Sequence, residues 1–556
     1  MKKSILLSGL LLICFIAEAQ YSRHIIRLTD KKGTAYSMSD PTGFLSPKAI
    51  NRRNKYKINI DSTDLPVSAA YLDSIKKAGT VVILSSSRWL NQVLIRTTDA
   101  NALLKISSFP FVKKTEPIAE RATTPLQAED KFADEKVASI QQPATVNQNN
   151  GDLISYGSSY GQIHIHEGEF LHNSGFQGQG ITLAVLDAGF KNYLTITAFD
   201  SLRKYNQILG QYDFVNNETS VNEDNSHGLF CFSIMAANLP GQFVGSAPKA
   251  SYYLFRTEDE FSEFPVEEHN WVVAAERADS LGADMISSSL GYSLFDDPAF
   301  NHTYADMNGN TTMVSRGADL AARKGMIVCN SAGNSGNDGW KYIIAPADGD
   351  SVLAVGAVDV KGAVAGFSSY GPSSDGQIKP DVASVGAGTF VIATNGAVAQ
   401  GDGTSFSNPN LAGLIACLWQ AFPEFSNMQI IDAVRRSSSK FANPDDRVGY
   451  GIPNMKLAYQ ILLEKKYEGV LQDDWVKAFP NPFRSDLNVI VKAKESGNIY
   501  YQLLDMSGRL IRKGSLISER DRVNSIQLPG LEQLPKGAYN LRIMNGNWDQ
   551  TIRLVK

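Results

Sequence analysis

The sequence is poor in cysteine and, beyond its first residues, contains no long apolar run. Four cysteines occur in 556 residues, and one of them, Cys14, falls within an N-terminal leader. The remaining three, Cys231, Cys329 and Cys417, are an odd number in an exported chain, which excludes a disulfide framework. Each lies in an apolar stretch, so we expect buried free thiols that pack as small hydrophobic side chains. No later stretch approaches the ~20 uninterrupted apolar residues of a membrane-spanning helix, so we predict no membrane span.

A nucleic-acid-binding motif is also missing, and the basic residues are scattered, so we expect no nucleic-acid partner. The net charge of −4 hides an asymmetry along the chain. Residues 21–120 have a net charge of +8, residues 121–475 of −19, and residues 476–556 of +6. Opposite charges on neighbouring segments predict that the basic segment is attracted to the acidic one. The alternative is an acidic surface that only keeps a secreted protein in solution.

The chain begins with the features of a secretory signal peptide, which we assign to residues 1–19. Lys2 and Lys3 form the basic start, residues 5–16 form the short apolar core, and Ala17-Glu18-Ala19 is a small-x-small cleavage site. The apolar core is too short to span a membrane. We therefore expect a protein that is secreted or displayed on the cell surface.

Residues 20–120 have the pattern of a small α+β unit. Strand patterns occupy residues 21–28, 81–84 and 92–96, and helical patterns occupy residues 67–77 and 99–106. Residues 121–154 then lose the apolar periodicity and are rich in proline, glutamine and asparagine, which predicts a solvated linker. A small basic unit joined by a polar linker to a larger acidic one suggests a pro-segment that is later removed.

Residues 155–468 alternate between short apolar runs and helical patterns. The apolar runs occur at residues 181–186, 251–255, 285–289, 326–330 and 352–357. Helical patterns at residues 271–281 and 317–324 separate several of these runs. Strands that are buried on both faces and alternate with helices predict a parallel sheet in a three-layer α/β domain. In such folds the active site lies beyond the carboxyl ends of the strands.

Residues 476–556 change character again. Strand-like runs recur at residues 487–491, 500–505, 525–528, 539–544 and 551–555. Turn signals such as Ser507-Gly508 and Lys536-Gly537 separate them. This spacing predicts a small all-β sandwich.

Three polar side chains occur where the α/β pattern places the ends of strands and helices. Asp187 ends the strand over residues 181–186, and His227 opens an apolar helix. Ser405 opens a helix that is apolar on nearly every face, where unpaired N–H groups converge. A histidine can accept the serine proton while the carboxylate fixes its tautomer, which makes these residues a candidate nucleophile, base and orienting acid. Considered alone, Ser405 could equally be the N-cap of a core helix.

Asn334 is a fourth candidate, because it directly follows the strand over residues 326–330 in a glycine-containing loop. Its side-chain amide could donate a hydrogen bond to an oxyanion, alongside the backbone N–H of Ser405.

These motifs together resemble those of a known family. The four signature stretches of subtilisin-like serine proteases are matched, in order, by Ala184-Val185-Leu186-Asp187, Ser226-His227-Gly228, Ala332-Gly333-Asn334 and Gly403-Thr404-Ser405. The resemblance implies a subtilisin-like α/β domain that cleaves polypeptide substrates through an acyl-enzyme. It implies Asp187, His227 and Ser405 as the catalytic triad and Asn334 as the oxyanion residue.

The same resemblance matches Ser289, Leu290 and Gly291 to the family's strand that pairs with an extended substrate. Phe230 and Phe406 depart from the usual pattern, since the family commonly has a histidine and a methionine there. Neither position belongs to the triad, so the departures concern the shape of the site and its rate rather than the reaction type.

The two flanking units resemble known domains as well. Residues 20–120 resemble, more loosely, the inhibitory pro-domain of these proteases, which implies a zymogen whose own pro-domain is an intramolecular inhibitor. Residues 476–556 resemble the C-terminal sorting domain of type IX secretion cargo. The residues that carry this second likeness are Phe479-Pro480-Asn481-Pro482-Phe483, Asp505-Met506-Ser507-Gly508, Gly537-Ala538-Tyr539 and Arg553-Leu554-Val555-Lys556. It implies passage through the periplasm and recognition by the type IX secretion machinery, with a carbohydrate-binding module as the alternative.

An acidic stretch precedes the helical pattern at residues 271–281. It consists of Glu258, Asp259, Glu260, Glu263, Glu267 and Glu268. In a subtilisin-like fold this loop borders the substrate cleft, which predicts a preference for basic residues N-terminal to the scissile bond. The alternative is a solvated acidic loop. Family members often bind calcium, but no loop of regularly spaced ligands occurs, so we assign no metal and no cofactor.

The sequence thus favours a secreted serine endopeptidase made as a zymogen, and two other functions stay open. A relative that has lost proteolysis would act as a surface binding protein. A serine-carboxyl peptidase also uses a Gly-Thr-Ser serine but has a glutamate base in place of histidine, so it would not need His227.

Overall fold

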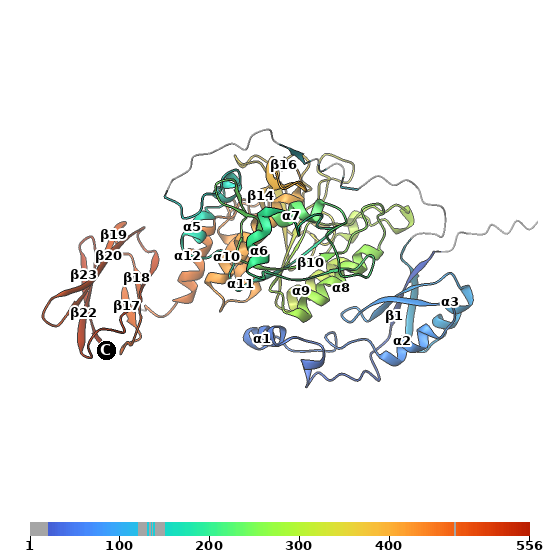
Figure 1. The fold of residues 1–556 in the computed structure, drawn as a ribbon, viewed down its shortest axis with the longest axis horizontal. Helices are drawn as coiled ribbons and strands as arrows, with labels where there is room; N and C mark the ends of the chain where they lie inside the picture. The colour runs from blue at the N-terminus through green and yellow to red at the C-terminus, as the bar shows by residue number, and fades with distance from the viewer. Residues whose placement is uncertain (1–20, 120–130, 133–134, 136, 140–150, 472–473) are drawn as a thin grey trace, which may run out of the picture.

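The computed structural model describes residues 21–119, 131–132, 135, 137–139, 151–471 and 474–556. Three folded units follow one another along the chain, and the C-terminal one lies at one end of the molecule (Figure 1). The signal peptide predicted for residues 1–19 falls outside the described residues. Within the described part of the chain, no helix combines the length and apolar character needed to cross a membrane.

The central unit is built on a seven-stranded sheet in which all neighbouring strands are parallel. The five predicted strands are present as β6 (Thr182–Asp187), β10 (Ser251–Arg256), β11 (Met285–Ser288), β12 (Ile327–Ser331) and β13 (Val352–Val358). The two edge strands, β7 (Ile208–Asp213) and β14 (Val382–Val385), were not predicted. β14 has only four residues and β7 is half exposed, so neither has a long apolar run.

Helices cover both faces of this sheet, which confirms the predicted three-layer α/β domain. One layer contains α8 (Val266–Leu281) and α9 (Met313–Arg323), and the other contains α7 (His227–Ala236) and α10 (Thr404–Ala421). Successive residues of β6 pack on opposite layers: Leu183 and Val185 join the core with α7 and α10. Because every side chain of β6 is therefore buried, its sequence is apolar until it reaches Asp187.

The N-terminal unit is a four-stranded antiparallel sheet with helices, as the α+β pattern predicted. The strands lie in the order β2 (Val82–Ser87), β3 (Gln92–Arg96), β1 (Arg23–Leu28) and β4 (Val112–Pro117). The predicted helices are α2 (Ala69–Lys76) and α3 (Ala100–Ser107). The pattern missed β4 and α1 (Pro47–Tyr56), since β4 is mostly polar and α1 buries arginines rather than an apolar stripe.

Buried ion pairs join this basic unit to the acidic central domain. Asp279 of α8 accepts hydrogen bonds from Arg52, from Arg53 (2.8 Å) and from Arg88 (3.2 Å). All four side chains are at least nine-tenths buried. The predicted attraction between the two units thus has a physical counterpart, because each buried charge has an opposite partner.

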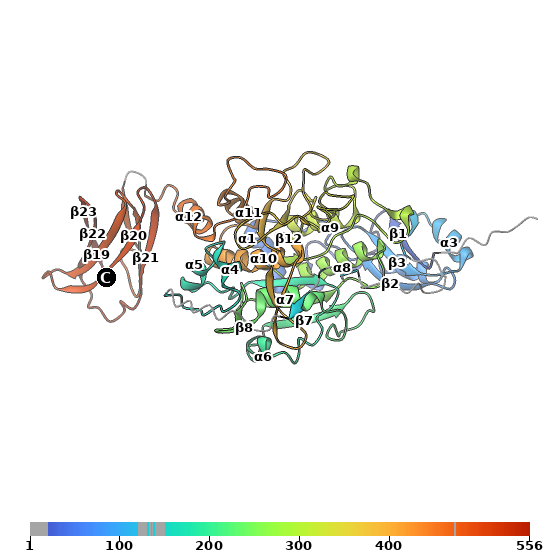
Figure 2. The same ribbon diagram turned by 90° about the horizontal axis from the view of Figure 1, so that it is seen from above.

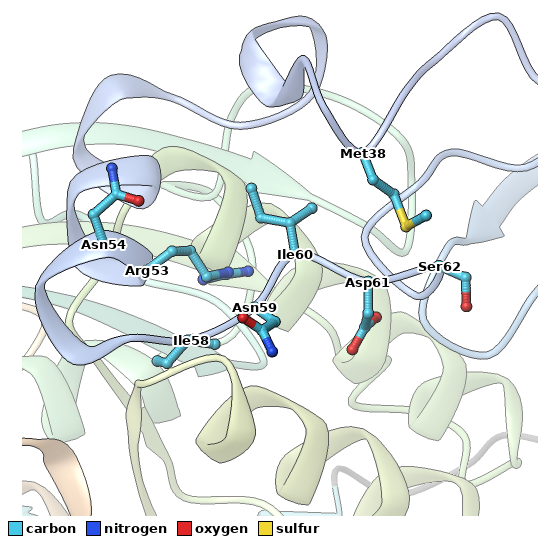
Figure 3. Close-up of a pocket in the computed structure, with 8 residues that line it drawn as sticks. All are labelled: Met38, Arg53, Asn54, Ile58, Asn59, Ile60, Asp61 and Ser62. Carbon is cyan, nitrogen blue, oxygen red and sulfur yellow. The ribbon is translucent and has the colours of Figure 1, made fainter.

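An open cavity of about 730 Å³ lies beside this contact, within the N-terminal unit (Figure 3). It is lined by Met38, Arg53, Asn54, Ile58, Asn59, Ile60, Asp61 and Ser62. All eight residues that line it belong to the N-terminal unit, and none belongs to the candidate catalytic set.

The C-terminal unit is a sandwich of two antiparallel sheets around its own apolar core, as predicted. One sheet contains β17 (Val476–Phe479), β18 (Leu487–Lys492) and β21 (Val523–Leu528), and the other contains β20 (Leu510–Ser518), β19 (Gly497–Asp505), β22 (Ala538–Asn545) and β23 (Trp548–Val555). β17 and β20 were not predicted, because the first is short and the second is a polar edge strand. Both views show the sandwich connected to the central unit after α12 (Met455–Lys466) (Figure 2).

The three cysteines in the described residues, Cys231, Cys329 and Cys417, are all buried and free, which confirms the expectation. Burial raises the pKa of each of the three thiols. They therefore stay protonated and act as small apolar side chains.

The described part of residues 121–154 does not behave as the solvated linker that we predicted. β5 (Ala138–Ser139) pairs with β16 (Val398–Gly401) of the central domain. Lys131, Phe132 and Glu135 lie against the central domain as well. The polar composition of this segment predicted contact with water. Lys131 and Glu135 instead contact charged side chains of the central domain.

Candidate active site

Asp187 and His227 meet where the end of β6 touches the start of α7. The Nδ1 atom of His227 lies 2.6 Å from Oδ1 of Asp187, and both side chains are buried. This contact needs a glycine after the histidine, because a Cβ at Gly228 would lie 2.5 Å from the carbonyl oxygen of Gly189 and 2.8 Å from the Cβ of Asp187. The bond to the carboxylate fixes the ring orientation and leaves Nε2 facing the cleft.

Ser405 lies in the first turn of α10, directly beside this pair. Its Oγ donates a hydrogen bond of 2.8 Å to Oε1 of Glu135, while Nε2 of His227 lies 3.0 Å from Oε2 of the same residue. The hydroxyl and the imidazole therefore face each other across a single carboxylate group. Among the described residues, no direct hydrogen bond links His227 to Ser405, because this carboxylate lies between them.

Asn334 completes the group from the loop after β12. Its Oδ1 accepts hydrogen bonds of 2.8 Å from the backbone N–H and from the hydroxyl of Thr404, which directs Nδ2 towards Ser405. That Nδ2 lies 2.5 Å from Oε1 of Glu135, the oxygen that Ser405 also contacts. Gly333, with a φ of +106°, supplies the left-handed backbone that turns the loop into this position.

Replacing Asn334 with alanine is expected to lower kcat by a factor on the order of 10²–10³ with a smaller change in KM. The reason is that a side-chain donor aimed at a developing oxyanion acts mainly in the transition state. Steady-state kinetics on a peptide substrate measures this. Alanine at the neighbouring exposed Asn337 is the control, and equal loss in both variants would contradict the assignment.

Glu135 is the functional residue that the sequence analysis missed. Its carboxylate accepts hydrogen bonds from Ser405 and Asn334 and faces His227, so it occupies the position of a reacting group. Burial alone would lower the pKa of His227, but the charges of Asp187 and Glu135 outweigh it and raise this pKa to about 10. With Glu135 in place the ring is therefore an imidazolium near neutral pH, and it cannot accept a proton from Ser405.

No signal in the sequence could have found Glu135, since it is one acidic residue in a polar segment far from the motifs. Its neighbour Phe132 stacks on the ring of His227, with 4.2 Å between the ring centres. Phe132 thus covers one face of the imidazole ring, while Glu135 covers its Nε2 atom.

Ser289, Leu290 and Gly291 follow β11 and line a cavity of about 200 Å³ together with Ser405 and Asn334. Ser289 fixes the local geometry, because its Oγ donates a hydrogen bond of 2.8 Å to the carbonyl oxygen of Ser405. The segment that the sequence predicted to bind substrate is therefore in direct contact with the candidate nucleophile.

The predicted acidic stretch divides into separate contacts. Glu258, Glu263 and Glu267 converge on the ammonium group of Lys131. Glu260 pairs with Arg256, and Glu268 pairs with His302. It is therefore not a solvated loop, and half of its carboxylates face the segment that contains Glu135.

Two clusters of the described residues have ligand atoms close enough to hold a cation. The first, Asp187, His227 and Cys231, is an unsuitable metal site because its thiol is held protonated and its other two members bond each other. The second is the group Glu258, Glu263 and Glu267, which already holds the ammonium of Lys131.

Comparison with known proteins identifies the three units. Residues 178–451 match the model of the Subtilase family, residues 23–135 match a peptidase S8 propeptide domain of Bacteroidota, and residues 477–556 match a secretion system C-terminal sorting domain. Subtilisin NAT of Bacillus subtilis subsp. natto and Subtilisin E of Bacillus subtilis (strain 168) are each 26% identical over 370 residues, covering 64% of this chain and 88% of theirs. Subtilisin of Bacillus pumilus is 28% identical over 294 residues, covering 52% of this chain and 94% of its own. A crystal structure of MycP1 with the N-terminal propeptide removed aligns over 54% of this chain and 96% of its own, at 21% identity and a TM-score of 0.44.

The chain therefore contains a subtilase domain at residues 178–451, preceded by a propeptide domain and followed by a C-terminal sorting domain. It is a serine-type endopeptidase made as a zymogen. The sorting domain marks it for type IX secretion, which delivers it outside the cell or to the cell surface.

Proposed function

We propose that Asp187, His227 and Ser405 are the catalytic triad of this endopeptidase and that Asn334 binds the oxyanion. One observation carries the proposal: Nε2 of His227, Oγ of Ser405 and Nδ2 of Asn334 all point at the single carboxylate of Glu135. A base, a nucleophile and an oxyanion donor must converge on one reacting group, and these three atoms do so from three separate elements.

Each group has one chemical task in the reaction. Ser405 attacks the substrate carbonyl while His227 takes its proton, and Asp187 stabilises the resulting imidazolium. Asn334 and the backbone N–H of Ser405 hold the oxyanion. His227 then gives the proton to the leaving amine. Water next attacks the acyl-enzyme with His227 again as the base, and Ser405 is released with its proton restored. Ser289, Leu290 and Gly291 present the edge on which an extended substrate pairs.

The domain limits that we propose are a signal peptide at residues 1–19, a pro-domain at 20–120, a linker at 121–154, a catalytic domain at 155–468 and a sorting domain at 476–556. The propeptide match extends to residue 135, past the proposed limit of the pro-domain, and we infer from this that Lys131 and Glu135 act with the pro-domain in inhibition. In this form Glu135 keeps His227 charged, so removal of the segment both opens the site and restores the base.

A serine-carboxyl peptidase is the second candidate, because the hydroxyl of Ser405 donates to the carboxylate of Glu135. In that mechanism Glu135 would have to stay bound at the site after processing and act as the base, and His227 would be dispensable.

Substitution of His227 with alanine separates the two candidates. The triad predicts that peptide hydrolysis by the processed protein falls by a factor on the order of 10⁴–10⁶. His164, which is half exposed and pairs with Glu169, is the matched control and should keep its activity after the same change. Activity retained in His227→Ala would support the glutamate base and reject the triad.

A further inference from the structure

The three carboxylates that face Lys131 form a closed coordination shell around one ammonium group. The Nζ atom lies 2.9 Å from Glu258, 2.7 Å from Glu263 and 2.8 Å from Glu267. The side chains of Glu258 and Glu267 are 2% and 1% exposed, and that of Glu263 is 21% exposed. An ammonium has three N–H donors, and this one donates hydrogen bonds to Glu258, to Glu267 and, at 3.3 Å, to the carbonyl oxygen of Ser262.

Lys131 supplies one ammonium group against three carboxylates, so it does not balance the acidic groups of this cluster. Burial opposes the charge of Lys131, but the three carboxylates outweigh it and raise the pKa of this lysine well above its usual value. Burial likewise raises the pKa of Glu263 to about 7 and raises the pKa of Glu267 well above its usual value. The nearby Arg256 cannot compensate, because it pairs with Asp213, Asp224 and Glu260. Loss of Lys131 would leave three nearly buried carboxylates without a cation, a strongly unfavourable arrangement.

The chain segment that contains Lys131 also connects these three carboxylates to the candidate catalytic centre. The backbone N–H of Lys131 donates a 3.0 Å hydrogen bond to the carbonyl oxygen of Glu260, as an added strand would. The next residue, Phe132, stacks on His227, and Glu135 reaches Ser405. Glu258 and Glu263 line the same cavity as Ser405 and Asn334, and Lys131 and Glu135 line it as well. A chain that crosses this cavity thus reaches the acidic group before it reaches the nucleophile.

We propose that Glu258, Glu263 and Glu267 form a specificity pocket for a lysine side chain of the substrate, N-terminal to the scissile bond. Lys131 occupies this pocket in the zymogen, and a substrate lysine replaces it in the processed enzyme. The inference rests on the proposed function, because it places the pocket on the substrate path to Ser405. Three acceptors around one nitrogen suit the compact ammonium of lysine better than the planar fork of arginine.

The test compares kcat/KM of the processed enzyme on peptides that differ at one position, scanned through the positions before the scissile bond. The three peptides carry lysine, arginine or norleucine, which has a similar apolar chain without the charge. We expect lysine to exceed norleucine by at least about tenfold at one position, and to exceed arginine there. Glu263→Gln should lower the ratio of kcat/KM on the lysine peptide to kcat/KM on the norleucine peptide severalfold. Glu263 is the chosen site because, among the described residues, its side-chain contact is with Lys131 alone.

Glu218→Gln is the matched control, since it removes an exposed carboxylate of the same domain and should keep the full ratio. Equal rates on lysine and norleucine peptides at every position would overturn the pocket while leaving the triad standing, because both peptides are still cleaved. A different result would show that the cluster is a metal site and that the proposal is wrong. In that result one calcium ion, added as calcium chloride, binds each processed enzyme molecule, this binding is lost in Glu263→Gln, and no lysine preference exists. Absence of all peptide cleavage would be a failure of the proposed function itself.

Discussion

Alanine in place of Ser405 is expected to abolish nearly all peptide hydrolysis, with a loss in kcat on the order of 10⁶. The hydroxyl of Ser405 is the only one that shares a carboxylate with both His227 and Asn334 in the described residues. Without it no acyl-enzyme forms, and the remaining rate reflects binding and the oxyanion donors alone. Because nucleophile and base act as a unit, the double variant with His227→Ala should be no worse than either single one.

Ser407 provides the matched control for this experiment. It lies two residues further along α10, is buried, and donates a 2.8 Å hydrogen bond to the carbonyl oxygen of Thr404. Its alanine variant should keep kcat within a few-fold, although it will lose some stability. Both variants must be compared as processed protein, so Ser405→Ala is best released by wild-type enzyme added in trans. A multiplicative loss in the double variant would show that Ser405 and His227 act separately.

Glutamine in place of Glu135 is expected to shorten the latency of the full-length zymogen by about tenfold or more. The charge of Glu135 contributes to the high pKa of His227, which is about 10. An opposite charge at this distance shifts a pKa by about 1–3 units, so its removal increases the fraction of neutral imidazole tenfold or more below pH 9. Glutamine has nearly the same shape, so the change removes charge and not volume.

The same contact predicts how the zymogen depends on pH. A histidine whose folded pKa is raised contributes stability that is complete below its unfolded value near 6.5 and is lost as pH rises through about 10. Self-processing of the wild type should therefore accelerate between pH 7 and pH 9, whereas Glu135→Gln should show much less acceleration. Gel analysis of processing over time measures both.

Glu116 gives the control for this substitution, because it belongs to the pro-domain and its ion pairs with Arg27 and Lys114 are partly exposed. Its glutamine variant should behave as the wild type. Unchanged latency and an unchanged pH profile in Glu135→Gln would mean that the pro-domain inhibits by coverage alone.

Much of the fold could be predicted because its signals are local. β6 is buried on both faces, so its sequence is continuously apolar and ends at a single aspartate. Ser405 could be placed at a helix start because α10 is buried all round and thus reads as an unbroken apolar run. The edge strands β7 and β14 and the arginine-bearing helix α1 lack such signals, since their neighbours rather than their own patterns determine them.

The inhibitory contacts were hidden for a related reason. Lys131 and Glu135 sit in a segment whose composition resembles a solvated linker, and their partners are more than ninety residues away along the chain. Only the excess of acidic residues at positions 258–268 hinted at a cationic partner, and the sequence assigned that role to substrates. In the structure, Lys131 of the chain itself supplies such a partner.

Labelling of the processed protein with a fluorophosphonate, followed by mass spectrometry of its peptides, tests the central claim most directly. The account predicts one adduct, located on Ser405 and absent in His227→Ala, with little labelling of the intact zymogen, in which Glu135 occupies the site. An adduct on another residue, or no adduct on processed protein that still cleaves peptides, would contradict it.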